Sequence, residues 1–280
     1  MTLTLNALRR LDNTPPWDWP EDTGTALIEV LGDRRAGEDE RILATELAGS
    51  SVVINDEMVD ALLTVLRCDD ESEKIRGKAA ISLGPVLEIC DIEGFDGPDS
   101  VGVAERTYRE IQAAMRATFF DAGVPIEVRR RVLEASVRAP LDWHPDALRS
   151  AYASDDEDWN LTAVFCMRYV SGFDEQILAS LESENPDIKV EAVLAAGAWA
   201  IGAAWSHVLP LISAESIEKR LLLAAIAAVG GIRPQEASYV LGDLADSDDP
   251  VIAEAVLEAT SMDGGEWDED DEDSDEDDEA

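Results

Sequence analysis

A segment that recurs about every thirty residues is the feature that most constrains this chain of 280 residues. Residues 74–84 (KIRGKAAISLG) and 187–197 (DIKVEAVLAAG) share an apolar residue, a basic residue after it, alanine four positions on and glycine nine positions on. A period of this length is typical of repeat proteins, in which each unit buries its apolar face against its neighbours. We call the first of these positions the anchor position. It recurs at spacings of 35, 53, 31, 29, 33 and 30 residues and is apolar in every segment except the first. The anchor residues are Glu40, Ile75, Val128, Trp159, Ile188, Leu221 and Val251.

Shorter amphipathic stretches lie between these segments. Residues 55–68 place Met58, Leu62 and Leu66 at helical spacing, and residues 174–183 and 236–247 show the same period. Each stretch is followed by a turn sequence with an N-cap residue, namely DDES, NPD or SDDP. We therefore predict an all-α fold, a right-handed α-solenoid of about seven helix-turn-helix repeats over residues 20–262.

The two clearest segments, EKIRGKAAISLG and NPDIKVEAVLAAG, resemble HEAT repeats, especially the short bacterial HEAT-like repeats also found in phycobilisome lyases. The resemblance covers about residues 20–262. It implies an α-solenoid, but it does not imply one function, because such repeats serve many unrelated roles.

Residues 191–212 form an apolar run in which no residue after Glu191 is charged unless His207 is protonated. Its length suits a membrane-spanning helix. However, Ala192, Ala195 and Gly197 fall at the small-residue positions of the repeat, and no cluster of basic residues flanks the run. We expect the run to be divided between a buried second helix and the first helix of the next repeat, which begins in SHVLPLI.

Three segments depart from the repeat. Residues 1–19 are predicted to cap the first repeat with Trp17 and Trp19, because terminal repeats need a cap. Residues 90–105 are an insertion loop that explains the spacing of 53, and they are either a binding loop or an extended linker. Residues 263–280 hold 13 acidic and no basic residues and are predicted to be a disordered acidic tail.

The net charge of −39 limits the kinds of partner that the protein can bind. A surface this acidic repels nucleic acid and anionic lipid and attracts cations or basic proteins. We expect a protein partner, with a basic protein among the candidates, and neither nucleic acid nor membrane. The chain has 4 Lys and 18 Arg against 61 acidic residues. Scarce lysine with many acidic residues is expected of a protein from a high-salt cytoplasm. It is equally expected where a GC-rich genome favours arginine and the function requires acidic residues. No apolar run of signal-peptide length opens the chain, so we predict a cytoplasmic protein.

No catalytic motif is apparent, and we predict no enzyme, cofactor or metal. His144 in DWHPD is open to two interpretations, an acid–base or metal site and a turn bracketed by Pro140 and Pro145, and the turn is favoured. The scattered Cys68, Cys90 and Cys166 match neither a disulfide framework nor a metal motif, and we expect buried thiols in a reducing compartment.

Two groups of residues are candidates for binding another protein. Arg129 and Arg130 belong to a run of three arginines on one predicted helix, and Arg129 occupies the basic position of the repeat. The tail supplies an aromatic anchor and carboxylates, with plain solubilisation as the alternative role. These tail candidates are Trp267, Asp270, Asp271 and Asp273.

The sequence thus favours a non-enzymatic scaffold for protein–protein interaction that uses the curved surface of the solenoid. One alternative is an acidic protein that binds or shields a basic partner, as a nucleic-acid mimic or a chaperone. A third hypothesis, implied by the resemblance to phycobilisome lyases, is a lyase-like chaperone for chromophore attachment.

Overall fold

The structure is a computed structural model that describes residues 3–95, 102–214 and 216–261. Within these ranges the chain consists of helices and turns with one isolated bridge between Asn55 and Gly102, which confirms the all-α class. The chain forms two compact units, Met1–Phe173 and Asp174–Ala280. Sequence reasoning treated the repeats as one array and did not anticipate this division.

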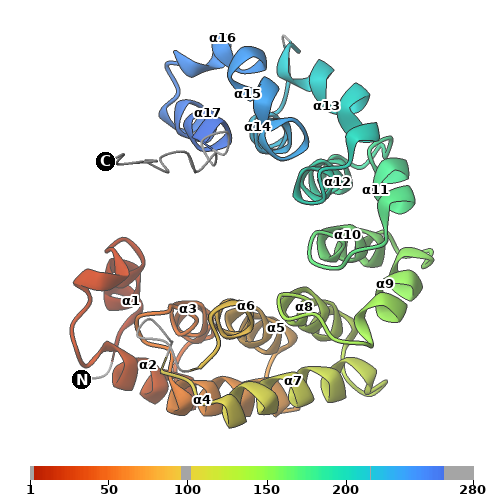
Figure 1. Ribbon diagram of the computed structural model, residues 1–280. Helices are drawn as coiled ribbons and strands as arrows, with labels where there is room; N and C mark the ends of the chain where they lie inside the picture. Colours follow the sequence, from red (N-terminus) through yellow and green to blue (C-terminus); the bar gives the residue numbers. More distant parts are fainter. Residues whose placement is uncertain (1–2, 96–101, 215, 262–280) are drawn as a thin grey trace, which may run out of the picture. The chain divides into compact units, whose positions relative to one another are not determined.

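The first unit holds four helix pairs, α2–α3, α4–α5, α7–α8 and α9–α10, together with α1 and α6 (Figure 1). The second helices α3, α5, α8 and α10 pack against one another in chain order and form one layer, while α2, α4 and α7 pack in order in the other. The bounds are α1 (Leu5–Asp12), α2 (Thr23–Gly32), α3 (Glu38–Leu47), α4 (Asp56–Arg67), α5 (Glu73–Ser82), α6 (Gly84–Glu93), α7 (Glu105–Phe120), α8 (Ile126–Ser136), α9 (His144–Tyr152) and α10 (Glu157–Cys166), with a short 3-10 helix η1 at Pro16–Asp18.

The second unit continues the plan with the pairs α11–α12 and α13–α14 and a final pair in which α15 and α16 together precede α17. Its second helices α12, α14 and α17 also pack in chain order. The bounds are α11 (Asp174–Ser180), α12 (Pro186–Ala198), α13 (Trp205–Ile212), α14 (Lys219–Ile232), α15 (Pro234–Val240), α16 (Gly242–Ala245) and α17 (Pro250–Ser261), with η2 at Gly202–Ala204.

The predicted register agrees with these helices. Each anchor position from Glu40 to Leu221 is the third residue of a second helix, and Val251 is the second residue of α17. The thirty-residue period therefore counts from one second helix to the next. The hand and the curvature of the stack stay predictions.

Glycine at the ninth position is required by close packing between second helices. A Cβ atom added to Gly49 would lie 2.7 Å from the Ser82 carbonyl oxygen, and one added to Gly197 would lie 2.7 Å from Ala228 Cα. Real Cβ atoms do not approach backbone this closely. The repeat therefore keeps glycine where the next helix rests on its backbone.

The apolar run is divided as the sequence predicts. α12 ends at Ala198, and Ala200 takes the left-handed conformation (φ 49°) while the Ile201 amide donates to the Ala196 carbonyl at 2.9 Å. This is the usual way in which a helix ends before a turn. The chain then enters α13, and no helix in the described ranges is long and apolar enough to cross a membrane.

The insertion differs from the prediction of a loop over residues 90–105. α6 carries the chain in helical form to Glu93, and it packs against α5, α7 and α8 with Cys90 buried. The extra length is therefore partly a helix that fills space in the core. Residues 96–101 lie outside the described residues.

The N-terminal cap is made mainly by α1, which packs on α3 and buries Leu8 completely. The Trp19 indole nitrogen donates to the carbonyls of Leu11 and Thr14 at 3.0 and 2.9 Å, which fixes the segment after α1. Trp17 is 77% exposed, so the expectation that it covers the first repeat is wrong.

Replacing Ala195 with glutamate tests the register. Ala195 is completely buried in α12, so Ala195→Glu places a carboxylate where it has neither room nor a partner, at a cost of several kcal/mol. Thermal unfolding should show a large fall in melting temperature. The matched control Ala113→Glu, on an exposed face of α7, should melt close to the parent. Equal melting of the two variants would contradict the assigned packing.

Candidate protein-binding surfaces of the first unit

An arginine joins the two helices of three pairs in the first unit. Arg41 Nη2 donates to the Leu31 carbonyl at 2.9 Å, Arg76 Nε to the Leu66 carbonyl at 3.0 Å, and Arg129 Nε to the Phe119 carbonyl at 2.7 Å. Each arginine is the fourth residue of a second helix, and each acceptor is the next-to-last residue of the first helix, ten positions earlier.

These acceptors are carbonyls that helix geometry leaves without an intrahelical partner. A guanidinium at that end also interacts favourably with the negative end of the helix dipole. The joint therefore closes the turn between paired helices. The basic position of the repeat is thus the one that supplies the arginine of the joint.

The three joints differ in what else contacts the guanidinium. Arg41 forms an ion pair with Glu71, and Arg76 lies 3.1 Å from Asp69 Oδ1. Arg129 has no carboxylate within ion-pair distance in the described part of the chain. Its guanidinium carbon lies 5.6 Å from the centre of the Phe119 ring and 6.0 Å from that of Trp159.

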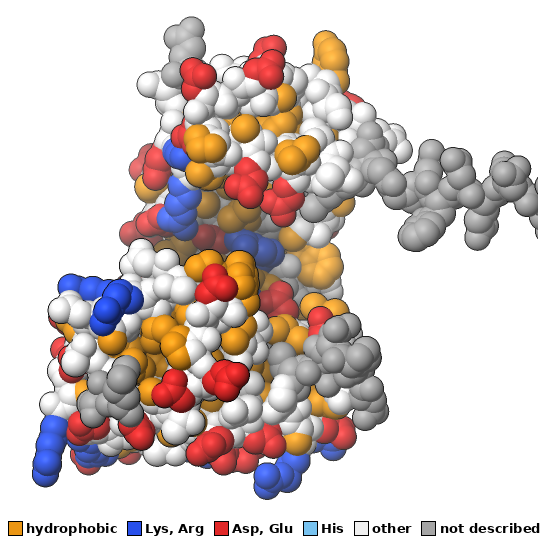
Figure 2. Space-filling view, turned by 90° about the vertical axis from the view of Figure 1, so that its left-hand side faces the viewer, with side chains coloured by type: hydrophobic (Ala, Val, Ile, Leu, Met, Phe, Trp, Pro, Cys, Tyr) orange, Lys and Arg blue, Asp and Glu red, His pale blue; other side chains and the backbone are white. Residues whose placement is uncertain are grey.

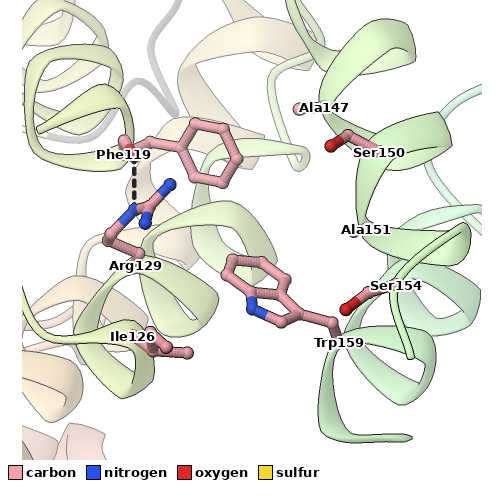
Figure 3. A pocket seen from close by; sticks show the side chains of 8 residues that line it. All are labelled: Phe119, Ile126, Arg129, Ala147, Ser150, Ala151, Ser154 and Trp159. Atoms are coloured by element: carbon pink, nitrogen blue, oxygen red, sulfur yellow. Dashed lines mark hydrogen bonds between the residues drawn. The ribbon is translucent and has the colours of Figure 1, made fainter. Parts of the chain in front are cut away.

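Arg129 forms one wall of a cavity of about 210 Å³ between the α7–α8 and α9–α10 pairs, which we call the Arg129 pocket (Figure 3). The Phe119 and Trp159 side chains extend into it from α7 and α10, and Ile126 lies at the start of α8. α9 contributes the opposite wall. The polar lining is Arg129, Ser150 and Ser154, and the apolar lining is Phe119, Ile126, Ala147, Ala151 and Trp159, so no acidic residue contributes.

Arg130 points away from this pocket and into the packing between α8 and α10. It is only 5% exposed, and its Nε donates to Thr162 Oγ1 at 3.1 Å while its Nη1 lies 3.0 Å from Glu127 and 3.1 Å from Asp158. Thr162 in turn donates to the buried Glu134 at 2.8 Å. The charge of Arg130 is therefore paired inside the unit.

A larger hollow of about 590 Å³ crosses the layer of second helices, and we call it the α5–α8 groove. Its lining comes from α3, α5, α8 and α10 and the turn after α8. It combines apolar, basic and acidic side chains. These are Ile42, Ile81 and Phe165, then Lys74, Lys78, Arg131 and Arg138, then Glu73, Glu127 and Glu134, with Gly77 at the base.

Two glycines, Gly77 and Gly84, leave room for the side chains of Arg131 and Arg138. A Cβ atom on Gly77 would lie 3.1 Å from Arg131 Cγ, and one on Gly84 would lie 2.9 Å from Arg138 Cδ. Both arginine side chains therefore pass closely over the backbone of a glycine.

The charged ends of these arginines are paired beside the groove. Arg131 donates to Glu127 at 2.9 Å and to Glu134 at 2.6 Å. Arg138 pairs with Glu88 and lies over the Tyr169 ring at 5.4 Å. The groove is thus close to electrically balanced, whereas the chain as a whole is strongly acidic.

On the face shown in Figure 2, basic side chains form small separate clusters among acidic and apolar ones. A continuous basic stripe, which a nucleic-acid groove needs, is absent from the described residues of that face.

His144 is the buried first residue of α9, and the predicted turn is confined to Asp142 and Trp143 directly before it. Its Nδ1 accepts the Leu141 amide at 2.7 Å, its Nε2 lies 3.0 Å from Ser136 Oγ, and its ring lies 3.9 Å from that of Trp143. Burial lowers the pKa of His144 to about 4, although the negative charge of Asp142 acts in the opposite direction. The imidazole is therefore neutral at pH 7. In the described residues no three His, Cys, Asp or Glu side chains are grouped to hold a metal ion.

None of the three cysteines is joined to another described residue by a disulfide. Burial raises the pKa of the Cys90 thiol to about 11, with a smaller contribution from Glu93, and Cys166 is also buried. Cys68 differs from the prediction, because it is only half-buried and accepts a hydrogen bond from Arg34 at 2.8 Å. The tail candidates Trp267, Asp270, Asp271 and Asp273 lie outside the described residues.

The sequence was compared with family models and with curated proteins. No family model and no curated protein matches it. Solved structures give weak likenesses. The Escherichia coli protein YIBA is 16% identical, with 92% of this chain and 86% of that chain covered and a TM-score of 0.46. Human deoxyhypusine hydroxylase is 16% identical, with 92% and 89% covered and a TM-score of 0.40. An engineered protein is 17% identical, with 75% and 97% covered and a TM-score of 0.42. At these values the likenesses carry no argument about this chain.

The depressed pKa of His144 predicts a pH dependence of folding. Well above pH 6.5 the histidine is neutral in both states, so the folded state keeps its full stability. As the pH falls toward 4 the unfolded state binds the proton more readily, and stability is lost by up to about 3 kcal/mol. Chemical denaturation of the parent and of His144→Asn should show this loss only in the parent. The control His207→Asn should behave as the parent, and parallel curves for all three would contradict the assignment.

Proposed function

We propose that this chain is a non-enzymatic scaffold of HEAT-like repeats that binds another protein in the α5–α8 groove. The observation that carries the proposal is the groove itself, in which apolar and charged side chains from four successive second helices line one hollow. A protein-binding surface needs apolar contacts surrounded by polar groups. Ile42, Ile81 and Phe165 supply the first, and the lysines, arginines and glutamates supply the second.

The near-balanced charge of the groove makes it a better binding surface for another protein than the acidic remainder of the chain. Long-range repulsion from a net charge of −39 opposes the approach of any acidic protein. The groove supplies four cations against three carboxylates, and exposed Lys74 has no ion pair in the described residues. A segment with apolar side chains and charges of both signs fits such a lining, as an amphipathic helix does.

The groove proposal predicts a loss of binding from one substitution. Ile81→Asp puts a carboxylate at an apolar position of the groove, so we expect it to abolish capture of the partner from a native lysate, as measured by quantitative mass spectrometry. Ile92→Asp is the matched control, because Ile92 is 76% exposed on α6 and does not line the groove. It should capture the partner as the parent does.

Two further measurements make this test decisive. Thermal unfolding of both variants should show that Ile81→Asp remains folded, since Ile81 is only half-buried. Amine-reactive cross-linking of the complex should join the partner to Lys74 or Lys78. Equal capture by folded Ile81→Asp and by the parent would overturn the groove as the binding surface. A catalytic activity that His144→Ala abolishes would overturn the scaffold.

A further inference from the structure

We infer that the Arg129 pocket is a second binding site, separate from the groove, which takes a carboxylate attached to a compact apolar group. The inference begins with a comparison inside the chain. The three arginine joints are built alike, and only the third lacks a carboxylate partner in the described residues.

The missing carboxylate can be traced to one position. The loops that precede α3, α5 and α8 are residues 33–37, 68–72 and 121–125, and each has five residues. Asp69, the second residue of its loop, pairs with Arg76 seven positions later. The second residue of the third loop is Ala122, seven positions before Arg129. The chain therefore lacks the carboxylate that completes the Arg76 joint. In the first loop this position is Arg34, and Arg41 pairs instead with Glu71 of the following loop.

Neighbouring carboxylates do not replace it. The loop before α10 spans residues 153–156 and is one residue shorter than the other three. In that loop Asp156 caps α10 by accepting the Asp158 amide at 2.9 Å, and Asp158 itself pairs with the buried Arg130. The place beside Arg129 is open to a group from outside the chain.

The chemistry of the pocket defines what this group is. Arg129 Nε is committed to the Phe119 carbonyl, so the two Nη groups remain as a planar pair of donors that suits a carboxylate. The rings of Phe119 and Trp159 lie near the guanidinium, and Ile126 adds apolar surface (Figure 3). Apolar surroundings strengthen the attraction between the guanidinium and a bound anion.

The size of the pocket limits the ligand to something small. Its volume of about 210 Å³ is below the range of about 300–1,000 Å³ that is usual for drug-sized ligands. One side chain with its terminal carboxylate fits this space. The same chemistry is offered by the C-terminal residue of a peptide chain and by a free aryl or alkyl carboxylic acid, so the experiment has to distinguish these two sources.

The test uses protein labelled with 5-fluorotryptophan and follows the ¹⁹F resonance of Trp159, which Trp159→Phe identifies by its loss. N-acetyl-phenylalanine should shift this resonance with saturation, whereas N-acetyl-phenylalanine amide should not. An acetylated tetrapeptide Ala-Ala-Ala-Phe with a free C-terminus and phenylacetate then compare the two sources. Tighter binding of the tetrapeptide assigns the pocket to chain termini, and tighter binding of phenylacetate assigns it to free acids.

Variants tie the signal to the pocket. Arg129→Gln should weaken binding of N-acetyl-phenylalanine by at least about tenfold, because a charge-assisted hydrogen bond is lost. The matched control Arg149→Gln, which removes an exposed arginine that pairs with Asp146 and does not line the pocket, should bind as the parent does. Because Arg129 also joins α7 to α8, Ser150→Trp provides a second test. It fills the exposed mouth without touching the joint and should also abolish binding.

The inference is overturned if no saturable shift appears up to about 10 mM ligand, if the amide binds as well as the acid, or if Ser150→Trp binds like the parent. It does not depend on the proposed function. Ile81→Asp should leave binding of N-acetyl-phenylalanine unchanged, so either proposal can fail while the other holds.

Discussion

The hydrogen bond from an arginine to a carbonyl ten residues earlier is the interaction on which the first unit depends. It ties the start of each second helix to the end of the helix before it, at Arg41, Arg76 and Arg129. It uses a carbonyl that the helix itself cannot satisfy. Because both helices are then fixed, the glycines at the ninth position can rest against the next second helix. In α10 the same position is Asn160, whose amide nitrogen donates to the carbonyl of Ser154 in the loop after α9 at 2.7 Å.

Helix α8 shows how neighbouring arginines take different roles. Successive residues on a helix point about 100° apart. Arg129 therefore faces the pocket, Arg130 enters the buried contact with α10, and Arg131 lies across Gly77 in the groove. One run of three like charges thus contributes to both proposed binding surfaces and to the packing between them. Carboxylates from Glu127, Glu134 and Asp158 keep the run compatible with folding.

The sequence was sufficient to predict the helix pairs, because the anchor positions recur at the start of every second helix. At Arg41, Arg76 and Arg129 the basic residue after the anchor bonds to the end of the preceding helix. The sequence also explained the apolar run, since Ala192 and Gly197 fit the repeat register and Ala200 turns the chain between α12 and α13. α6 was missed because its sequence follows α5 directly and lacks the repeat frame. The Arg129 pocket was missed because it depends on the absence of a carboxylate at position 122, which is alanine. Comparing Asp69 and Arg76 with Ala122 and Arg129 is the sequence comparison that finds it.

The partner of each arginine joint decides whether the joint serves the fold alone or also binds a ligand. The most direct test restores the missing partner with Ala122→Asp and titrates this variant with N-acetyl-phenylalanine while following the Trp159 resonance. Ala122 is exposed and is the equivalent of Asp69, so the new carboxylate should pair with Arg129. We expect ligand binding to be lost while the melting temperature stays the same or rises. A variant that still binds the ligand like the parent would contradict this role of the joint's partner.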